Sequence, residues 1–237
     1  MKRLLCLLFA LLLCTGCAGA EQAFPVLDTL LEGTITLLDG DFTLLYTLPQ
    51  LIDSSGAAES VSGYYAQMEA QLASLWEPSA LDEAFNGELS FQMTHGDERY
   101  VSFAFTLLST AGNGESTTLF ADTFAMDGLY AGQKVSLSQL LGLEEESTGP
   151  DELSLASRLA YQLVWQIIYQ ESQNPDGDYL DGLTEQQVQQ AFDPEQDFYL
   201  DADGNVVFFI QSGEIAGEIA GILEYPFSIA EIISTLQ

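Results

Sequence analysis

The chain has 237 residues, and its 36 Asp and Glu against 5 Lys and Arg give a formal net charge of −31 at pH 7. A nucleic-acid backbone is bound by clustered Lys and Arg, so the composition argues against DNA or RNA as partners. It also argues against direct contact with anionic lipid head groups. A hydrophobic content of 47% argues against disorder. Such a charge favours cations and cationic proteins, although a solvated acidic surface with no dedicated partner is the alternative.

The N-terminus has the pattern of an export signal. Residues 1–3 are basic, and the apolar run from Leu4 to Leu13 is far shorter than the ~20 residues that span a bilayer. Small residues then precede Cys17, as a lipoprotein signal peptidase requires. We therefore predict a signal peptide over 1–17, lipid on Cys17 and a short tether over 18–25. Cleavage after Ala20, giving simple secretion, is the alternative.

The cysteines are consistent with export but not with a disulfide scaffold. Cys6 and Cys14 would leave with the signal peptide, and the lipid would block Cys17. The folded body would then have no thiol for a disulfide, a metal site or a nucleophile.

The first half of the body predicts two strands, a helix and a β-meander. Residues 34–38 and 41–46 flank Asp39-Gly40 as a hairpin, and Pro49 is expected to end the second strand. An apolar stripe predicts a helix over 57–76 whose face packs in a core rather than lining a sugar groove. Strands over 88–93, 100–107 and 117–124 follow, with turns at Gly96 and at 111–114. The stripe consists of Val61, Tyr64, Tyr65, Met68, Leu72, Leu75 and Trp76.

The second half predicts helices around another hairpin. A helical turn starts at Ser136, a long helix starts at residues 150–152 and ends near Gln170, and a short helix follows Thr184. Apolar residues alternate on both sides of 201–205, which predicts a tight hairpin, and Val207 and Phe209 suggest that it is covered on both faces. A last helix over 228–236 would be capped by Ser228. Its predicted inward residues are Ile229, Ile232, Ile233 and Leu236.

The segment from Asp197 to Phe227 also carries a family resemblance. Its Phe198-Tyr199-Leu200 strand, acidic Gly turn, Val206–Ile210 strand, Glu214-Ile215-Ala216 and Tyr225-Pro226-Phe227 resemble the C-terminal domain of the RsiV anti-sigma factor family. PdaC-type peptidoglycan deacetylases and many surface lipoproteins share that domain. Residues 133–141 and the segment from about Thr34 extend the resemblance. It implies an α+β fold with helices on one face of an antiparallel sheet, a PdaC-like module over 26–90 and an RsiV-like domain over 91–237.

Two family motifs are missing from the chain. Relatives often carry a Gly-Gly-Ala-His-Gly-like turn where this chain has residues 111–115, Ala-Gly-Asn-Gly-Glu. They also commonly have Pro-Tyr after Glu-Ile-Ala, where this chain has Gly217-Glu218. A cytoplasmic sigma-binding region followed by a transmembrane segment is not present either, so the chain is not expected to be an anti-sigma factor.

Motifs for chemistry are scarce. His95 is the only histidine and is expected at the surface of a turn, so multi-His metal sites are excluded. There is no Gly-x-Ser-x-Gly elbow and no phosphate-binding glycine loop. The acidic loops at 176–182 and 201–205 do not meet the calcium-loop spacing, and turn chemistry explains the second. We expect no metal and no cofactor.

These observations predict a lipid-anchored protein on the outer face of a bacterial cytoplasmic membrane that binds a ligand without catalysis. The resemblance implies cell-wall peptidoglycan or lysozyme as the ligand, and the charge suits a cationic protein such as lysozyme. It also implies five ligand-binding residues, namely Tyr199, Glu214, Ile215, Glu218 and Tyr225. The alternative is a carboxylate-dependent hydrolase of the cell wall, since carboxylates are abundant.

Overall fold

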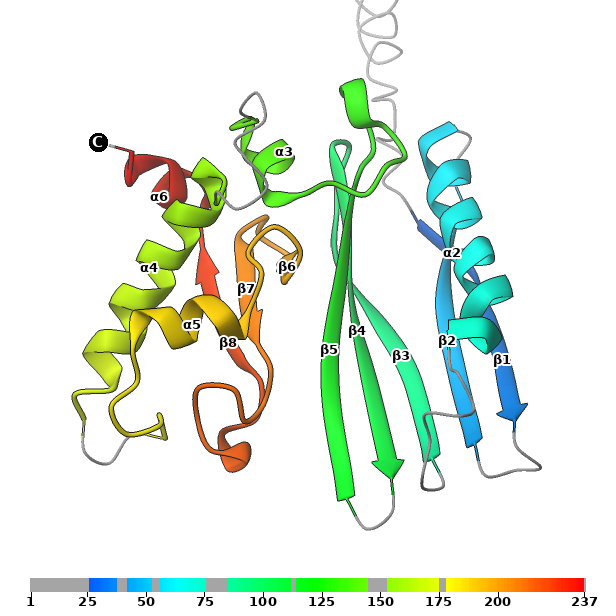
Figure 1. Ribbon diagram of the computed structural model, residues 1–237. Coiled ribbons are helices and arrows are strands. Elements are labelled where there is room, and N and C mark those ends of the chain that lie inside the picture. Colours follow the sequence, from blue (N-terminus) through cyan, green and yellow to red (C-terminus); the bar gives the residue numbers. More distant parts are fainter. Residues whose placement is uncertain are drawn as a thin grey trace, which may run out of the picture.

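The protein folds as two β-sheets with helices, in an α+β arrangement that confirms the predicted class (Figure 1). The computed structural model describes residues 26–37, 42–52, 56–75, 85–111, 114–144, 153–174 and 178–236. The predicted signal peptide, Cys17 and the tether lie outside these ranges. The strand order is β1-β2-β3-β4-β5 in the first sheet and β6-β7-β8 in the second.

The first sheet contains the predicted hairpin and meander. β1 (Val26–Leu37) pairs antiparallel with β2 (Phe42–Ile52), and β3 (Phe85–Gly96), β4 (Tyr100–Ala111) and β5 (Gly114–Ala125) form consecutive antiparallel pairs. β2 and β3 are parallel, because α2 (Gly56–Leu75) carries the chain back between them. The predicted domain boundary at residues 90 and 91 falls within β3 and stays a prediction.

Helix α2 covers one face of this sheet, as its apolar stripe predicts. Val61, Tyr65 and Leu72 are buried there, and the Tyr65 ring meets Phe103 and Phe124 edge to face. Tyr64 differs from these three residues, since 36% of it is exposed.

The prediction that Pro49 ends a strand is wrong. β2 continues to Ile52, and Pro49 is paired opposite Leu30 of β1. β3 pairs with β2 only as far as Tyr46, so at Pro49 the strand has β1 as its one strand neighbour. Proline is tolerated at this position because, within the described residues, no strand on the β3 side needs a backbone N–H as a hydrogen-bond donor.

The second sheet consists of β6 (Phe198–Leu200), β7 (Val206–Ile210) and β8 (Leu223–Phe227). Every residue of β7 is buried, which confirms a hairpin covered on both faces. One face packs against α4 (Leu155–Glu171), α5 (Glu185–Ala191) and α6 (Ile229–Ser234), with α3 (Leu137–Leu141) joining the same core. Short 3-10 turns, η3 (Gly128–Tyr130) and η4 (Glu218–Ala220), complete the described elements.

Helix starts and ends follow local capping chemistry. Ser136, Thr184 and Ser228 cap α3, α5 and α6 as predicted, each within a capping box. The predicted start of α4 is wrong, because Ser154 caps this helix and Leu155 is its first residue. Residues 150–152 themselves lie outside the described ranges. Ile233 and Leu236 are exposed rather than inward, whereas Ile232 is buried and Ile229 is partly buried against the same core.

The two sheets pack against each other. Phe209 of β7 meets Leu119 and Ala121 of β5, on the face opposite to α2. His95 reinforces this contact, since its Nδ1 is 2.9 Å from the Asp201 carbonyl oxygen and its Nε2 is 3.4 Å from the Asp97 carboxylate. Its side chain is only 10% exposed, so the prediction of a surface histidine is wrong. His95 lies one residue before the end of β3, beside the turn that follows β6 in the second sheet.

Gln211 protects the edge of β5. Its Oε1 accepts from the Leu119 N–H at 3.1 Å, and its Nε2 donates to the Leu119 carbonyl at 2.7 Å. The side-chain amide thus takes the place of a neighbouring strand.

We expect Gln211→Ala to lower the free energy of unfolding by about 1–2 kcal/mol, because two backbone groups lose their partner. Urea denaturation measures it, with the exposed Gln67→Ala as the control. Equal stability of the two variants would contradict the role of Gln211.

Candidate functional site

Two regions are candidates for a binding site, and they lie in different parts of the fold. The first contains the five residues that the family resemblance implies, around β6, β8 and the connection between β7 and β8. The second is a cavity between α2 and the first sheet.

The five residues of the first region do not form one cluster. Tyr199 is paired with Val207 and Tyr225 with Phe208, so these two tyrosines lie on opposite faces of the second sheet. Glu214 and Glu218 are exposed in the connection between β7 and β8. Ile215 is fully buried in the core, so its side chain fixes this connection rather than facing solvent.

The hydroxyl groups of both tyrosines are hydrogen-bonded to acidic or phenolic side chains. The Tyr199 hydroxyl donates to Glu224 Oε1 at 2.8 Å, and burial together with this carboxylate raises the Tyr199 pKa. The Tyr225 hydroxyl is 3.2 Å from that of Tyr179, which donates to Glu171 at 2.6 Å. Burial raises the pKa of Tyr225 to about 12. Both phenols therefore stay neutral at physiological pH and act as hydrogen-bonding groups.

The surface of the first region is acidic and carries one prominent apolar residue. No Lys or Arg follows Arg158 in the sequence, so Glu214, Glu218 and Glu224 have no basic neighbours from the second sheet or its helices α5 and α6. Ile219 follows Glu218 and is fully exposed.

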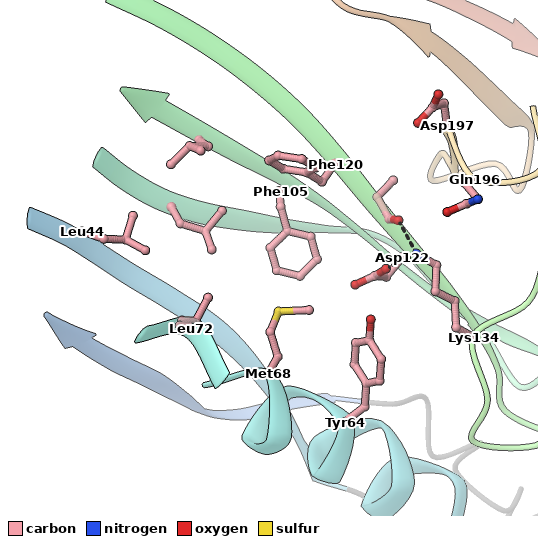
Figure 2. A pocket seen from close by; sticks show the side chains of 13 residues that line it. Leu44, Tyr64, Met68, Leu72, Phe105, Phe120, Asp122, Lys134, Gln196 and Asp197 are labelled. Atoms are coloured by element: carbon pink, nitrogen blue, oxygen red, sulfur yellow. Dashed lines mark hydrogen bonds and ion pairs between the residues drawn. The ribbon is translucent and has the colours of Figure 1, made fainter. Parts of the chain in front are cut away.

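The second region is a cavity of about 500 Å³ (Figure 2). Figure 2 shows Met68 and Leu72 of α2 facing Phe105 and Phe120 of the sheet, so most of its wall is apolar. Tyr64, Asp122, Lys134, Gln196 and Asp197 gather at one end, where η3 and the second half of the chain meet the sheet. The remaining lining residues are Leu44, Leu89, Leu107 and Ala121.

A buried carboxylate organises this polar end. Asp122 Oδ1 is 2.5 Å from Lys134 Nζ, and Oδ2 accepts from the Tyr65 hydroxyl at 3.1 Å. Lys134 Nζ also donates to the Ala121 carbonyl at 3.3 Å. Burial and the charge of Asp122 raise the pKa of Tyr64 to about 12, so its hydroxyl keeps its proton.

Asp197 lies at the rim of the polar end. Its Oδ2 accepts from the Asp193 N–H at 2.7 Å. Burial and the charge of Asp193 raise the Asp197 pKa, more than that hydrogen bond and the charge of nearby Lys134 lower it. A further positive charge close to this carboxylate would lower its pKa again and stabilise the ionised form.

Sequence reasoning missed the cavity, although two signals pointed to its polar end. Asp122 interrupts an apolar stretch of β5 at a position that faces α2, where a carboxylate needs a partner. Lys134 is one of three basic residues outside the predicted signal peptide. Their pairing depends on how η3 returns the chain to the end of β5, and that geometry has no sequence pattern.

Neither region holds a recognisable metal site. Across the ranges that the structure describes, no three His, Cys, Asp or Glu side chains gather in a way that could bind a metal. In the turn after β6, the Asp201 carboxylate accepts from the N–H groups of Asp203 and Asn205, as turn chemistry predicts. Part of the other acidic loop, at 175–177, lies outside the described residues. In the described part of the chain, no helix combines the length and apolarity needed to cross a membrane.

The fold and the two candidate regions define the chain as an α+β protein with an acidic surface loop and an apolar cavity. No family model and no curated protein matches its sequence. Two of its structural neighbours are proteins of the DUF3298 family. One, from Bacteroides fragilis NCTC 9343, has a TM-score of 0.48 at 13% identity and covers 89% of this chain and 98% of its own. Another, from Pseudomonas aeruginosa PAO1, has a TM-score of 0.44 at 12% identity, covering 87% and 94%.

Proposed function

We propose that the protein is a bacterial cell-surface lipoprotein, anchored through Cys17, whose body is an RsiV/PdaC-like binding module rather than an enzyme. Its ligand is a cationic protein such as lysozyme, with cell-wall glycan as the other candidate. The Lys2-Arg3 start, the short apolar run and Cys17 support the anchor. Nucleic acid is not among the proposed partners, because the chain lacks a basic cluster.

The exposed loop between β7 and β8 is the observation on which the binding role rests. Glu218 and the fully exposed Ile219 lie in the same connection as Glu214, and Glu224 is the second residue of β8, the strand that follows. Uncompensated carboxylates attract a basic protein from a distance, whereas an apolar residue contributes once it is desolvated. The buried Ile215 holds this connection on the core.

One observation favours the alternative of a wall hydrolase. Asp122 and Asp197 both line the polar end of the cavity, and a raised pKa on one of two carboxylates is typical of a glycosidase acid. However, Asp122 is already occupied by Lys134 and Tyr65, and the walls are apolar rather than hydrogen-bonding. A sugar chain would leave most of its hydroxyl groups unpaired there. Binding is therefore the better supported function.

Calorimetric titration of lysozyme and of solubilised peptidoglycan into the protein without its signal peptide tests the proposal. We expect lysozyme to bind, with an affinity that falls as salt is raised from low to physiological concentration. A Glu214→Gln/Glu218→Gln variant should bind about tenfold more weakly. The control is Glu88→Gln/Glu115→Gln, which removes two exposed charges from the first sheet.

Three results would contradict this function. Failure of both ligands to bind would refute the binding role. Equal weakening by the two double variants would refute the loop as the contact surface. Release of reducing sugar ends from peptidoglycan, lost in Asp197→Asn, would support the hydrolase instead.

A further inference from the structure

The cavity beneath α2 has the size and composition of a small-molecule site. Its volume of about 500 Å³ falls within the range of roughly 300–1,000 Å³ that is common for such sites. Met68, Leu72, Phe105 and Phe120 supply a wall that favours an apolar body of matching width (Figure 2). A polar group is needed only at one end, so the shape suits an amphipathic molecule.

The charges at the polar end determine which head group fits. The charges of Asp122 and Lys134 neutralise each other, since Oδ1 and Nζ are 2.5 Å apart. A second N–H of Lys134 donates to the Ala121 carbonyl. Asp197 then leaves the lining with a net charge of about −1 when it is ionised. An anionic head group would meet two carboxylates and a lysine that is already paired, whereas a cationic one would meet Asp197 directly.

The pKa of Asp197 is consistent with this assignment. Burial and the neighbouring Asp193 make ionisation of this carboxylate less favourable, and the charge of Lys134 offsets this only in part. A bound cation would remove that penalty, and in doing so it would gain a charge-assisted hydrogen bond. The Tyr64 hydroxyl and the Gln196 amide, which also line this end, supply further polar contacts.

We propose that the cavity binds an amphipathic molecule with an unbranched or aromatic apolar body and a primary ammonium head, the body lying between α2 and the sheet and the head at Asp197. This site lies apart from the loop between β7 and β8, so the proposal is independent of lysozyme or glycan binding.

Isothermal titration with three eight-carbon probes tests the head-group preference. Octylammonium, 1-octanol and octanoate share one apolar body and differ in charge. We expect a 1:1 complex with octylammonium, about tenfold weaker binding of octanol, and weaker binding still of octanoate. Octanoate binding as tightly as octylammonium would overturn the proposed head-group chemistry.

Two pairs of variants locate the site. Met68→Trp should fill the cavity and weaken octylammonium binding at least tenfold, whereas Gln67→Trp, on the exposed side of α2, should leave it unchanged. Asp197→Asn should weaken octylammonium about tenfold and leave octanol unaffected, with Asp203→Asn in an exposed turn as its control. Circular dichroism confirms that each variant is folded. Equal affinity for Met68→Trp and Gln67→Trp would overturn the cavity as the binding site.

Discussion

Replacing Glu195 with alanine should lower the free energy of unfolding by about 3 kcal/mol, because one carboxylate fixes the starts of two helices. Its oxygens accept from the Ser138 N–H at 2.9 Å, the Ser138 hydroxyl at 2.5 Å and the Ser154 hydroxyl at 2.5 Å. Ser154 caps α4, and Ser138 is in the first turn of α3. Loss of the carboxylate leaves these donors without their partner. Denaturation in urea measures the change.

The same carboxylate should give a defined pH dependence. Burial raises the Glu195 pKa, but the hydrogen bonds from Ser138 and Ser154 outweigh it and the pKa is lowered overall. A lowered folded-state pKa means that the stabilisation is complete above the unfolded value of roughly 4.3 and is lost as pH falls through the folded value. The difference between the wild type and Glu195→Gln should therefore shrink as the protein is acidified.

Glu115→Ala is the control for this prediction, because Glu115 is exposed on β5 and its loss should cost less than about 0.5 kcal/mol. A Glu195→Ala variant as stable as this control would show that the two helix starts do not depend on the carboxylate. A wild-type to Glu195→Gln difference that stays constant down to acidic pH would contradict the role of its charge.

Local rules explain why much of the fold could be predicted from the sequence. Ser136, Thr184 and Ser228 cap helices because each is followed three residues later by a Gln or Glu that completes a capping box. The turn at 201–205 forms because Asp201 accepts backbone N–H groups and Gly204 takes a φ of 79°. These contacts lie within a few residues of one another, so the pattern of the chain is sufficient to predict them.

The parts that could not be predicted depend on distant partners. Pro49 can stay in a strand only because β3 stops pairing with β2 at Tyr46. His95 is covered because the turn after β6 places the Asp201 carbonyl beside it. In both cases the residue type suggests a surface or a break, and a neighbour from elsewhere in the chain overrides it.

The candidate sites also combine features that the sequence implies with features that depend on distant parts of the chain. The sequence implies, through the family resemblance, that Glu214 and Glu218 bind the ligand, but it does not show that Tyr199 and Tyr225 occupy opposite faces of one sheet. Similarly, it predicts α2 and the meander, whereas the cavity between them depends on how far the helix lies from β4 and β5. A gap between two correctly predicted elements has no local signature.

The packing of α2 against the first sheet can be measured at Tyr64 and Tyr65, because these two adjacent tyrosines have different surroundings. Tyr65 is fully buried, contacts Phe103, Phe105 and Phe124, and donates to Asp122. Tyr65→Ala should therefore lower the free energy of unfolding by about 4 kcal/mol, the usual cost of removing a large aromatic ring from a core. Tyr65→Phe should cost about 1–2 kcal/mol, since it keeps the ring and leaves Asp122 short of one donor.

Tyr64→Ala is the matched control, because Tyr64 is partly exposed at the cavity and its ring meets those of Tyr65 and Phe124 edge to face. We expect it to cost about 1 kcal/mol in the same urea titration. Equal losses for Tyr64→Ala and Tyr65→Ala would contradict the placement of α2 on the sheet. A loss in Tyr65→Phe as large as in Tyr65→Ala would instead mean that the hydrogen bond to Asp122, rather than aromatic packing, holds the helix on the first sheet.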